Sequence, residues 1–374
     1  MNLIEFGTIS HIKKGKKPLR QTDKPQDGYM PYVDIEAFET GNVKMYTDGE
    51  KCLPCKAGDI LIVCDGSRSG FVGKAIDGYV GSTLAIITAD GMSQEYLYYF
   101  LQGKYVLLNT KKKGTGTPHL DANILNQQKL VVPSLEEQKR VVAQIEELFS
   151  ELDNGVETLQ KTKQQLAVYR QAVLKEYFGE IKEYIPLGKI TVSRLGKMLD
   201  KEKNTGILQP YLRNINVRWF SLDLSDLLEM RIEPEENEKY SVTKGDLIIC
   251  EGGEPGRCAI WEQDDTIFYQ KALHRVRFTD DSNPKFYMYY FWLAAQTGKL
   301  NPFFTGMGIK HLTGQSLVKV PVPTARKEEQ DLIVQEIEYR LSVCDSIEKT
   351  VDTALQQAEA MRQSILKKAF EGEL

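Results

Sequence analysis

The feature that most constrains this chain is a long helical sequence that occurs twice. Residues 136–178 align with residues 328–370 without a gap, at a constant offset of 192, and 16 of the 43 aligned positions are identical. Both copies begin with Glu-Glu-Gln and end in an Arg-Gln-x-x-Leu-Lys-x-x-Phe pattern. Self-similarity at a fixed spacing is typical of a repeated structural unit, so the architecture has to be interpreted as two copies of one arrangement.

The repeat extends upstream of the helical sequences. Several short anchors recur in the same order in both halves, while the sequence between them differs. In the first half they are Pro31-Tyr32, Gly58-Asp-Ile-Leu-Ile, Tyr98-Tyr-Phe100, Gly114-Thr-Gly-Thr-Pro-His-Leu120 and Lys129-Leu-Val-Val-Pro133; in the second they are Pro210-Tyr211, Gly245-Asp-Leu-Ile-Ile, Tyr289-Tyr-Phe291, Gly306-Met-Gly-Ile-Lys-His-Leu312 and Lys319-Val-Pro-Val-Pro323. A shared scaffold with diverged insertions suits a protein that does one job twice on two different targets.

A length of 374 residues is too great for one compact core. We expect an α+β chain with two mixed α/β lobes, at about 1–133 and 182–322, separated by an antiparallel pair of long coiled-coil helices. The helical segments are expected at about 134–181 and 323–374.

The chain has the features of a cytoplasmic protein. Its first residues lack the basic, apolar and small-residue pattern of a signal peptide, and no run of 18 apolar residues could span a membrane. Six cysteines in so long a chain indicate free thiols rather than a disulfide framework.

Each helical segment carries a narrow apolar stripe at spacings of three and four residues. Such a stripe resembles the seam of a coiled coil and needs a partner surface. The stripe residues are Val141, Ile145, Leu148, Leu152, Val156, Leu159, Leu166, Val173 and Tyr177 in the first segment and Ile333, Ile337, Leu341, Cys344, Ile347, Val351, Leu355, Ala358, Met361 and Ile365 in the second. We favour pairing of the two segments with each other; the alternatives are packing of each on its own lobe, or dimerisation.

Within the lobes, the Gly-Asp anchors predict short buried strands that follow a turn. Residues 95–102 and 284–293 predict short aromatic helices. Their Tyr and Phe side chains could stack on bases, but the helical spacing favours a place in the core.

The net charge of −4 does not exclude a nucleic-acid partner, because the charge is unevenly divided. The lobes sum to +2 and +1, and the helical segments to −3 and −4. This asymmetry is small, so local clusters are more informative than the total. Cations gather at residues 11–20, 111–113, 213–218 and 274–277.

The catalytic and metal motifs that occur are incomplete. Cys52-Leu-Pro-Cys55 has no second ligand pair nearby, so a zinc site is not expected. The glycine-rich segments 65–70 and 251–256 match neither a P-loop nor a dinucleotide fingerprint, and are interpreted as equivalent turns with outward-facing side chains. Asn301-Pro-Phe-Phe304 is similar to the base-holding loop of adenine methyltransferases but lacks its second proline and a glycine-rich cofactor loop. We therefore predict a binding protein rather than an enzyme, with no catalytic or metal-binding residues.

The order of elements resembles the DNA-specificity subunit of type I restriction–modification systems. The resemblance covers essentially the whole chain, and its most specific parts are the two junctions, Val131-Val-Pro-Ser-Leu-Glu-Glu-Gln138 and Pro321-Val-Pro-Thr-Ala-Arg-Lys-Glu-Glu-Gln330. The second junction is two residues longer than the first.

The resemblance implies two target-recognition domains that each read one half of a bipartite, asymmetric double-stranded DNA site, with the helix pair setting the spacer. A tandem repeat whose helices pair antiparallel would have a pseudo-twofold axis, and half-sites on one face of DNA lie about one helical turn apart. By resemblance, two modification subunits dock on the chain, bring S-adenosylmethionine and flip an adenine for N6 methylation. A motor–nuclease subunit that uses ATP and Mg can join them. This chain itself would bind no cofactor.

Candidate residues follow from these expectations. Lysines on loops are the expected phosphate contacts, and Arg, Asn or His side chains the expected base readers. The DNA-binding candidates are Lys13, Lys14, Lys16, Lys17, Arg68, Lys111, Lys112, Lys113 and His119 in the first lobe and Arg213, Asn214, Asn216, Arg218, Arg257, Arg275, Lys310 and His311 in the second. The subunit-docking candidates are Glu136, Glu137, Gln138, Arg170, Phe178, Glu328, Glu329, Gln330, Arg362 and Phe370.

Two other functions remain open at this point. One is a fused DNA methyltransferase or endonuclease with its own recognition domains, which would need cofactor and catalytic motifs that are not found. The other is a helical scaffold whose lobes bind proteins. Methylation by the chain alone would favour the first, and absence of specific DNA binding the second.

Overall fold

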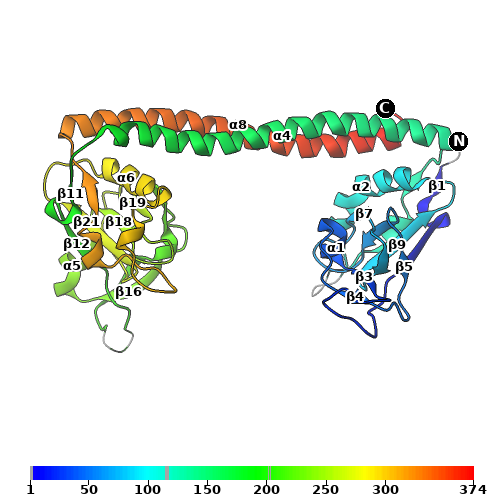
Figure 1. Ribbon diagram of the computed structural model, residues 1–374, viewed down its shortest axis with the longest axis horizontal. Coiled ribbons are helices and arrows are strands. Elements are labelled where there is room, and N and C mark those ends of the chain that lie inside the picture. Colours follow the sequence, from blue (N-terminus) through cyan, green and yellow to red (C-terminus); the bar gives the residue numbers. More distant parts are fainter. Residues whose placement is uncertain (1–2, 114–117, 201, 203) are drawn as a thin grey trace. The chain divides into compact units, whose positions relative to one another are not determined.

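The computed structural model describes residues 3–113, 118–200, 202 and 204–374 (Figure 1). The chain divides into two compact units, residues 1–160 with 352–374, and residues 161–351. Each unit contains a globular lobe and parts of two long helices, α4 (Leu135–Glu180) and α8 (Lys327–Glu371). The first unit takes the beginning of α4 and the end of α8, and the second takes the reverse.

The first lobe, which precedes α4, is built on two four-stranded sheets. One has the strand order β2-β9-β6-β7 and is antiparallel throughout; the other has the order β4-β3-β8-β5, with a parallel pair between β3 and β8. The strands are β2 (Ser10–Lys14), β3 (Met30–Val33), β4 (Tyr46–Thr47), β5 (Pro54–Cys55), β6 (Ile60–Val63), β7 (Val72–Lys74), β8 (Gly78–Val80) and β9 (Leu84–Ala89).

The second lobe, between α4 and α8, repeats this topology strand for strand. Its sheets have the orders β12-β21-β18-β19 and β16-β13-β20-β17, again with one parallel pair, β13 with β20. The strands are β12 (Thr191–Leu195), β13 (Ile207–Leu212), β16 (Leu228–Ile232), β17 (Ser241–Val242), β18 (Leu247–Cys250), β19 (Cys258–Ile260), β20 (Ile267–Tyr269) and β21 (Leu273–Phe278). The predicted mixed α/β repeat is therefore confirmed, including the buried strands after both Gly-Asp anchors.

Short elements complete each lobe. Two-stranded pairs tie the start of each lobe to the strand before its helix, β1 (Ile4–Glu5) with β10 (Lys129–Leu130) and β11 (Tyr184–Pro186) with β22 (Pro321–Pro323). The second lobe also has the pair β14 (Val217–Arg218) and β15 (Ser221–Leu222). The short helices are α1 (Ile35–Thr40), α2 (Gln94–Thr110), α3 (Ala122–Asn126), α5 (Asn237–Tyr240), α6 (Pro284–Gln296) and α7 (Gly314–Leu317), with 3-10 turns η1 (Phe6–Thr8), η2 (Leu187–Lys189), η3 (Asn214–Asn216), η4 (Pro234–Glu236) and η5 (Asn301–Phe303).

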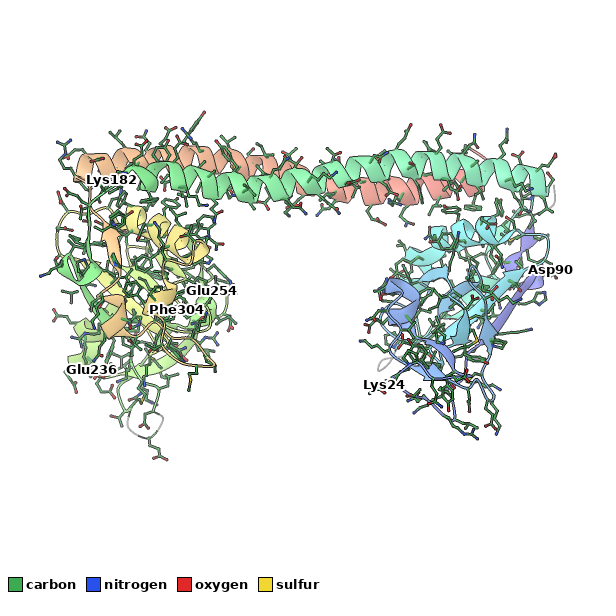
Figure 2. The ribbon with its side chains drawn as sticks, in the orientation of Figure 1. Lys24, Asp90, Lys182, Glu236, Glu254 and Phe304 are labelled. Atoms are coloured by element: carbon green, nitrogen blue, oxygen red, sulfur yellow. The ribbon has the colours of Figure 1, made fainter. Side chains whose placement is uncertain are left out.

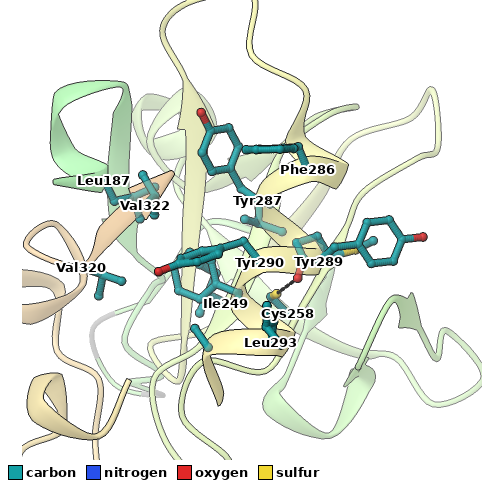
Figure 3. Close-up of a cluster of buried hydrophobic side chains, with 14 of the residues drawn as sticks. Leu187, Ile249, Cys258, Phe286, Tyr287, Tyr289, Tyr290, Leu293, Val320 and Val322 are labelled. Atoms are coloured by element: carbon teal, nitrogen blue, oxygen red, sulfur yellow. Dashed lines mark hydrogen bonds between the residues drawn. The ribbon is translucent and has the colours of Figure 1, made fainter. Parts of the chain in front are cut away.

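The aromatic helices belong to the core. In α6, Tyr287 and Tyr289 are 1% and 7% exposed, and the helix packs on strands β18 and β19 (Figure 3). Asn283 and Ser93 cap α6 and α2, each accepting a hydrogen bond from a backbone N–H of the first turn. The interpretation of these aromatic side chains as core rather than base-stacking residues is confirmed for both helices, since Tyr96 is also buried.

Within each unit α4 and α8 pair antiparallel, as predicted. In the second unit Arg170 donates to Asp345 at 2.6 Å and to Glu348 at 2.8 Å. In the first unit the repeat-equivalent residues Arg362 and Asp153 form the same ion pair. Farther along α4, Glu176 pairs with Arg340 of α8, so residue numbers rise along one helix as they fall along the other, which is the signature of antiparallel pairing. Two of the predicted stripe residues, Ile347 and Met361, are exposed rather than at the seam.

A buried glutamine joins the start of each long helix to its lobe. The Gln138 carboxamide oxygen accepts from the Ser93 backbone N–H at 2.8 Å, and its amide donates to the carbonyls of Gly91 and Pro133. In the second unit Gln330 accepts from the Asn283 N–H at 2.8 Å, and its amide donates to the Ala325 carbonyl at 2.9 Å. Both glutamines are almost fully buried, so each fixes the N-cap residue of the aromatic helix below it.

A phenylalanine joins the end of each long helix to the lobe of the other half. Phe178, at the end of α4, is buried in the second lobe with its ring centroid 5.0 Å from that of Phe286. Phe370, at the end of α8, packs in the first lobe with ring centroids 5.0 Å from Tyr96 and 5.4 Å from Phe100. Each lobe is therefore held by the beginning of one helix and the end of the other.

These contacts correct most of the predicted docking residues. Gln138, Gln330 and Phe178 are buried, Phe370 is largely enclosed, and Arg170 and Arg362 are engaged by acids of the neighbouring helix. The glutamine and phenylalanine side chains fasten lobes to helices, and the two arginines join α4 to α8. The remaining candidates, Glu136, Glu137, Glu328 and Glu329, lie at exposed or partly exposed positions in the first turns.

Replacing Gln138 with Ala should loosen α2 locally. The Ser93 N–H would lose its acceptor, and a lost buried hydrogen bond costs about 1–3 kcal/mol. We expect amide exchange in the first turn of α2 to accelerate on the order of 10- to 100-fold, measured by hydrogen–deuterium exchange. Gln335→Ala, at an exposed position of α8, is the control. Unchanged exchange in the Gln138 variant would contradict the fastening role.

Candidate nucleic-acid interface

In the first lobe Asp65 collects two of the predicted DNA-binding side chains. Lys14 Nζ donates to Asp65 at 2.7 Å, and His119 Nδ1 lies 2.7 Å from its other oxygen. Partial burial alone would raise the pKa of Asp65, but the hydrogen bonds from Lys14 and His119 outweigh this and lower the pKa. The Asp65 carboxylate therefore stays ionised and holds the Lys14 and His119 side chains beside the turn of residues 65–70.

The predicted lysine run follows α2 and lies beside the same turn. Lys112 Nζ donates to the Ser67 carbonyl at 3.2 Å, and Lys113 pairs with Asp121 at 2.9 Å. The backbones of Lys113 and His119 exchange hydrogen bonds of 2.9 and 2.8 Å, which closes the intervening loop. Residues 114–117 of the first Gly-Thr-Gly segment lie outside the described residues.

The remaining first-lobe candidates are Arg68 and four lysines. Arg68 forms an ion pair with Glu39 and lies 4.3 Å above the ring of Phe71. The other candidates are exposed, and over the described part of the chain they form no ion pair. They are Lys13, Lys16, Lys17 and Lys111.

A close backbone approach positions the lysines after β2. A side chain at Gly15 would place its Cβ 2.3 Å from the Gly81 carbonyl, so only glycine fits. The same contact recurs in the second lobe, where a Cβ at Gly196 would lie 2.3 Å from the Gln270 carbonyl. The backbone therefore takes the same course after β2 and after β12, but the residues that follow differ between the lobes.

In the second lobe an amide and a guanidinium organise the equivalent turn. The Asn214 amide donates to the Gly252 carbonyl at 2.6 Å, and Arg257 donates to the Asn214 side-chain oxygen at 2.7 Å. Arg257 also pairs with Glu254 at 2.9 Å, and Glu254 accepts from the Trp219 indole N–H at 2.7 Å. These contacts bring segments 213–219 and 251–257 together.

The remaining members of the 213–218 group differ in exposure. Arg213 pairs with Asp226 at 2.7 Å, and its side chain is 20% exposed. Arg218 is 49% exposed, and its nearest acid, Asp223, lies 3.8 Å away. Arg218 is therefore the more available hydrogen-bond donor. Arg213 could contact a base only by breaking its ion pair with Asp226 or by binding both groups at once.

The last two candidates lie on the loop that corresponds to 113–119. Thr305 and His311 close this loop with two backbone hydrogen bonds of 2.8 Å. Lys310 is exposed, and His311 is partly exposed beside Gly252. Both lobes thus place a His-containing loop against the turn that follows a buried strand, β6 in the first lobe and β18 in the second. The contact is a backbone hydrogen bond in each case, from the Leu120 N–H to the Cys64 carbonyl and from the Leu312 N–H to the Glu251 carbonyl.

Two second-lobe candidates are corrected by their burial. Asn216 is 2% exposed and bonds to the carbonyls of Asp223 and Asp226. Arg275 is 5% exposed and donates to the carbonyls of Glu238 and Ser241, away from the other candidates. Both side chains hold loops in place and cannot reach a base edge without unfolding their surroundings.

Sequence reasoning missed the acids that orient the cationic side chains. Asp65, Glu254 and Asp226 each hold a candidate donor, yet they are separated from most of these partners along the chain. The only sequence signal of Asp65 and Glu254 is their position in the glycine-rich turns, and Asp226 has no such signal. Asn109, which donates to the carbonyls of Ser67 and Ser69, was also missed.

The described residues contain no group of three or more side chains suited to hold a metal ion. Over the same residues, no helix is long and apolar enough to cross a membrane. The arrangement offers hydrogen-bond donors and cations on converging loops, which is chemistry for recognising an anionic polymer with readable edges.

Comparison with known proteins assigns the family. The model of the type I restriction modification DNA specificity domain matches residues 1–167 and 176–357. The chain therefore belongs to this family.

Relatives match over nearly the whole chain. The specificity subunit of the type I restriction enzyme MjaVIII from Methanocaldococcus jannaschii is 24% identical and covers 100% of this chain and 92% of its own length. The specificity subunit of EcoKI from Escherichia coli K12 is 22% identical, covering 98% and 84%. A chain from a structure of type I R-M complex assembly aligns with a TM-score of 0.77 at 18% identity, covering 100% of this chain and 98% of its own. The HsdS subunit from Thermoanaerobacter tengcongensis gives 0.57 at 18% identity, covering 100% and 97%.

A buried histidine supports the second-lobe loop and makes a pH prediction possible. His274 Nε2 donates to the Leu312 carbonyl at 2.8 Å, while its buried Nδ1 has no hydrogen-bond partner among the described residues. Burial lowers the pKa of His274, although the hydrogen bond to Leu312 opposes the shift. The folded state therefore binds its proton less readily than the unfolded state, so stability is lost as pH falls below the ordinary histidine pKa of about 6.5.

Replacing His274 with a residue that cannot be protonated should make the stability of the chain depend less on pH. We expect the melting temperature of the chain to fall more between pH 7.5 and 5.5 than that of the His274→Gln variant, because Gln keeps a donor but cannot be protonated. Differential scanning fluorimetry measures both. His11→Gln, at an exposed strand residue, serves as a control and should follow the unmodified chain. Equal slopes for the chain and His274→Gln would contradict the assignment.

Proposed function

We propose that this chain is the DNA-recognition subunit of a type I restriction–modification complex, and that each lobe reads one half of a bipartite, asymmetric site. The observation that carries this is the repeated loop scaffold. In both lobes the turn after the buried strand, β6 or β18, lies against a His-containing loop, but the side chains on these turns and loops differ. One scaffold with two sets of donors is suited to two different half-sequences.

We assign the phosphate contacts to the exposed lysines and the base contacts to the side chains with shaped donor geometry. In the first lobe Arg68 and His119 are the reading candidates, and in the second lobe Arg218, Arg213 and Asn214, supported by Arg257, Lys310 and His311. Arginine and asparagine can form paired hydrogen bonds with guanine and adenine edges in the major groove.

We place the partner subunits on the long helices. In the second unit α8 exposes Leu332, Tyr339 and Val343, at spacings of seven and four residues, and α4 exposes Val168 and Tyr169. A set of apolar side chains of this kind on a helical surface favours a protein partner. Two modification subunits that carry S-adenosylmethionine, and a motor subunit that uses ATP and Mg, would supply the chemistry, and this chain would supply no catalytic group. The spacer between half-sites would be set by α4 and α8.

Mapping methylated adenines tests the proposal directly. Cells that contain the modification subunit are compared with and without this chain, and methylated adenines are located by sequencing. We expect one two-part sequence to be methylated only when the chain is present. Methylation of the same sequence by the purified chain alone would favour a fused methyltransferase instead, and absence of any chain-dependent methylation would favour a protein scaffold.

Removing phosphate-contacting lysines should weaken binding to all sequences alike. For a Lys13→Ala/Lys16→Ala variant we expect the slope of log affinity against log salt to become shallower by about 2, because each phosphate contact contributes about 0.9. Fluorescence anisotropy of the full complex on cognate and unrelated duplexes measures this. Lys56→Ala, at an exposed lysine that is not among the candidates, is the control. A change confined to the cognate duplex would show that these lysines read bases.

Removing a reading arginine should relax one position of the second half-site. Arg218→Ala and Arg213→Ala are each expected to lose about 1–3 kcal/mol of discrimination at one base pair, with other positions unaffected. The measurement is the methylated sequence of each variant. Arg231→Ala, an exposed arginine on β16, is the matched control. If Arg213→Ala leaves both the methylated sequence and the affinity unchanged, its assignment as a reader is wrong.

A further inference from the structure

The loop of residues 305–311 presents an apolar tip to solvent. Met307 and Ile309 are 109% and 73% exposed, the two highest values among the large apolar side chains that the structure describes. A single exposed apolar side chain is ordinary on a protein surface. Here two of them occupy one short loop, separated only by Gly308, and lie one after the other on its tip.

This tip stands on a rigid stem. Besides the two hydrogen bonds between Thr305 and His311, the Leu312 N–H donates to the Glu251 carbonyl at 2.7 Å, and His274 donates to the Leu312 carbonyl. Gly306 adopts a φ of +98°, and a Cβ there would lie 2.3 Å from the Ile309 carbonyl. The stem therefore fixes the backbone of the loop. The apolar side chains of the tip are not needed to hold the loop in place.

The first lobe has the same stem, and the sequence of its loop is polar where that of the second lobe is apolar. Its loop is also seven residues long and is closed by the same backbone pair, Lys113 with His119. In the sequence, Met307 and Ile309 correspond to Thr115 and Thr117, which lie outside the described residues. Because threonine occupies both positions in one copy of the loop, an apolar side chain is a property of the second lobe rather than of the stem.

A lysine and a histidine directly follow the apolar tip along the chain. Lys310 follows Ile309 directly, with its Nζ 6.0 Å from the centre of the Phe304 ring, and His311 lies beside the turn that Asn214 holds. Figure 2 labels Phe304 and Glu254, which mark the two loops in the second lobe. Apolar side chains flanked by cations fit a duplex, which offers phosphates at its rim and apolar base faces inside the stack.

We propose that Met307 and Ile309 form a wedge that inserts between stacked base pairs in the half-site read by the second lobe and bends the DNA there. The inference rests on the proposed function, which it deepens. It also gives the two lobes different modes of recognition. The first lobe would read by polar contacts on an undistorted half-site, and the second partly by how easily its half-site unstacks.

The test uses the complete complex with modification subunits and a duplex that carries the mapped methylation site. 2-Aminopurine is placed at successive non-target positions of the second half-site, so that flipping of the target adenine does not contribute, and donor and acceptor dyes on the duplex ends report bending. We expect a several-fold fluorescence rise at one step and a shortened end-to-end distance. In Met307→Thr/Ile309→Thr, which copies the first lobe, both signals should fall to near the free-DNA value, with affinity reduced about tenfold.

Two control variants make the result specific. Met307→Leu/Ile309→Val keeps an apolar tip and should retain unstacking and bending. Val192→Thr replaces an exposed apolar residue on β12 of the same lobe, 55% exposed, and should behave as the unmodified chain.

Three results would overturn the wedge. The first is unchanged unstacking and bending in the threonine variant, which leaves DNA recognition by the lobe intact. The second is loss of modification subunits from that variant, which makes the tip a protein contact. The third is lack of sequence-specific binding by the unmodified complex, which removes the proposed function and the wedge together.

Discussion

The interactions on which the rest of the structure depends are those that fasten each lobe to two helices. A buried glutamine, Gln138 or Gln330, ties the first turn of a long helix to the N-cap of an aromatic helix in the lobe before it. A phenylalanine, Phe178 or Phe370, anchors the last turn of a long helix in the lobe of the other half. Burying one such ring contributes about 1.5–3 kcal/mol. Neither lobe is held by one helix alone, so the antiparallel pairing within each unit and the placement of its loops are fixed together.

This arrangement explains why the repeat is strict in some places and loose in others. Positions that serve both copies in the same way keep the same side chain, as with Arg170 and Asp345 in one unit and Arg362 and Asp153 in the other. The loops after the central strands are held through backbone hydrogen bonds, so their side chains are free to differ without loss of the scaffold. Asp65 with Lys14 and His119 occupies in one lobe the place of Asn214 with Arg257 and Glu254 in the other. Recognition can therefore diverge while the fold does not.

The sequence predicted the fold better than it predicted the site. Helix pairing, buried strands and aromatic cores follow from periodicity, which is a local property of the chain. The roles of Gln138 and Phe178 did not follow, because a residue identical in both copies is equally compatible with an exposed docking surface and with a buried fastening, and only burial distinguishes them. The cations of the site could be located by composition, but Arg275 and Asn216 were placed wrongly because a polar residue on a strand or turn can face either way. Asp65 lies about 50 residues along the chain from both Lys14 and His119, so no local pattern reveals these pairs, and the nearby pair of Glu254 with Arg257 was overlooked.

We propose that each lobe, with its helix ends, is a complete recognition module on a shared scaffold. This is tested by replacing the second lobe with a second copy of the first, joined at the equivalent strands after α4 and before α8. The copied lobe then has to supply packing partners for Phe178 and Gln330. The measurement is the methylated sequence in cells that hold the modification subunit. We expect a site in which the half-sequence of the first lobe occurs twice. Retention of the original asymmetric site, or a new sequence containing neither half, would contradict it.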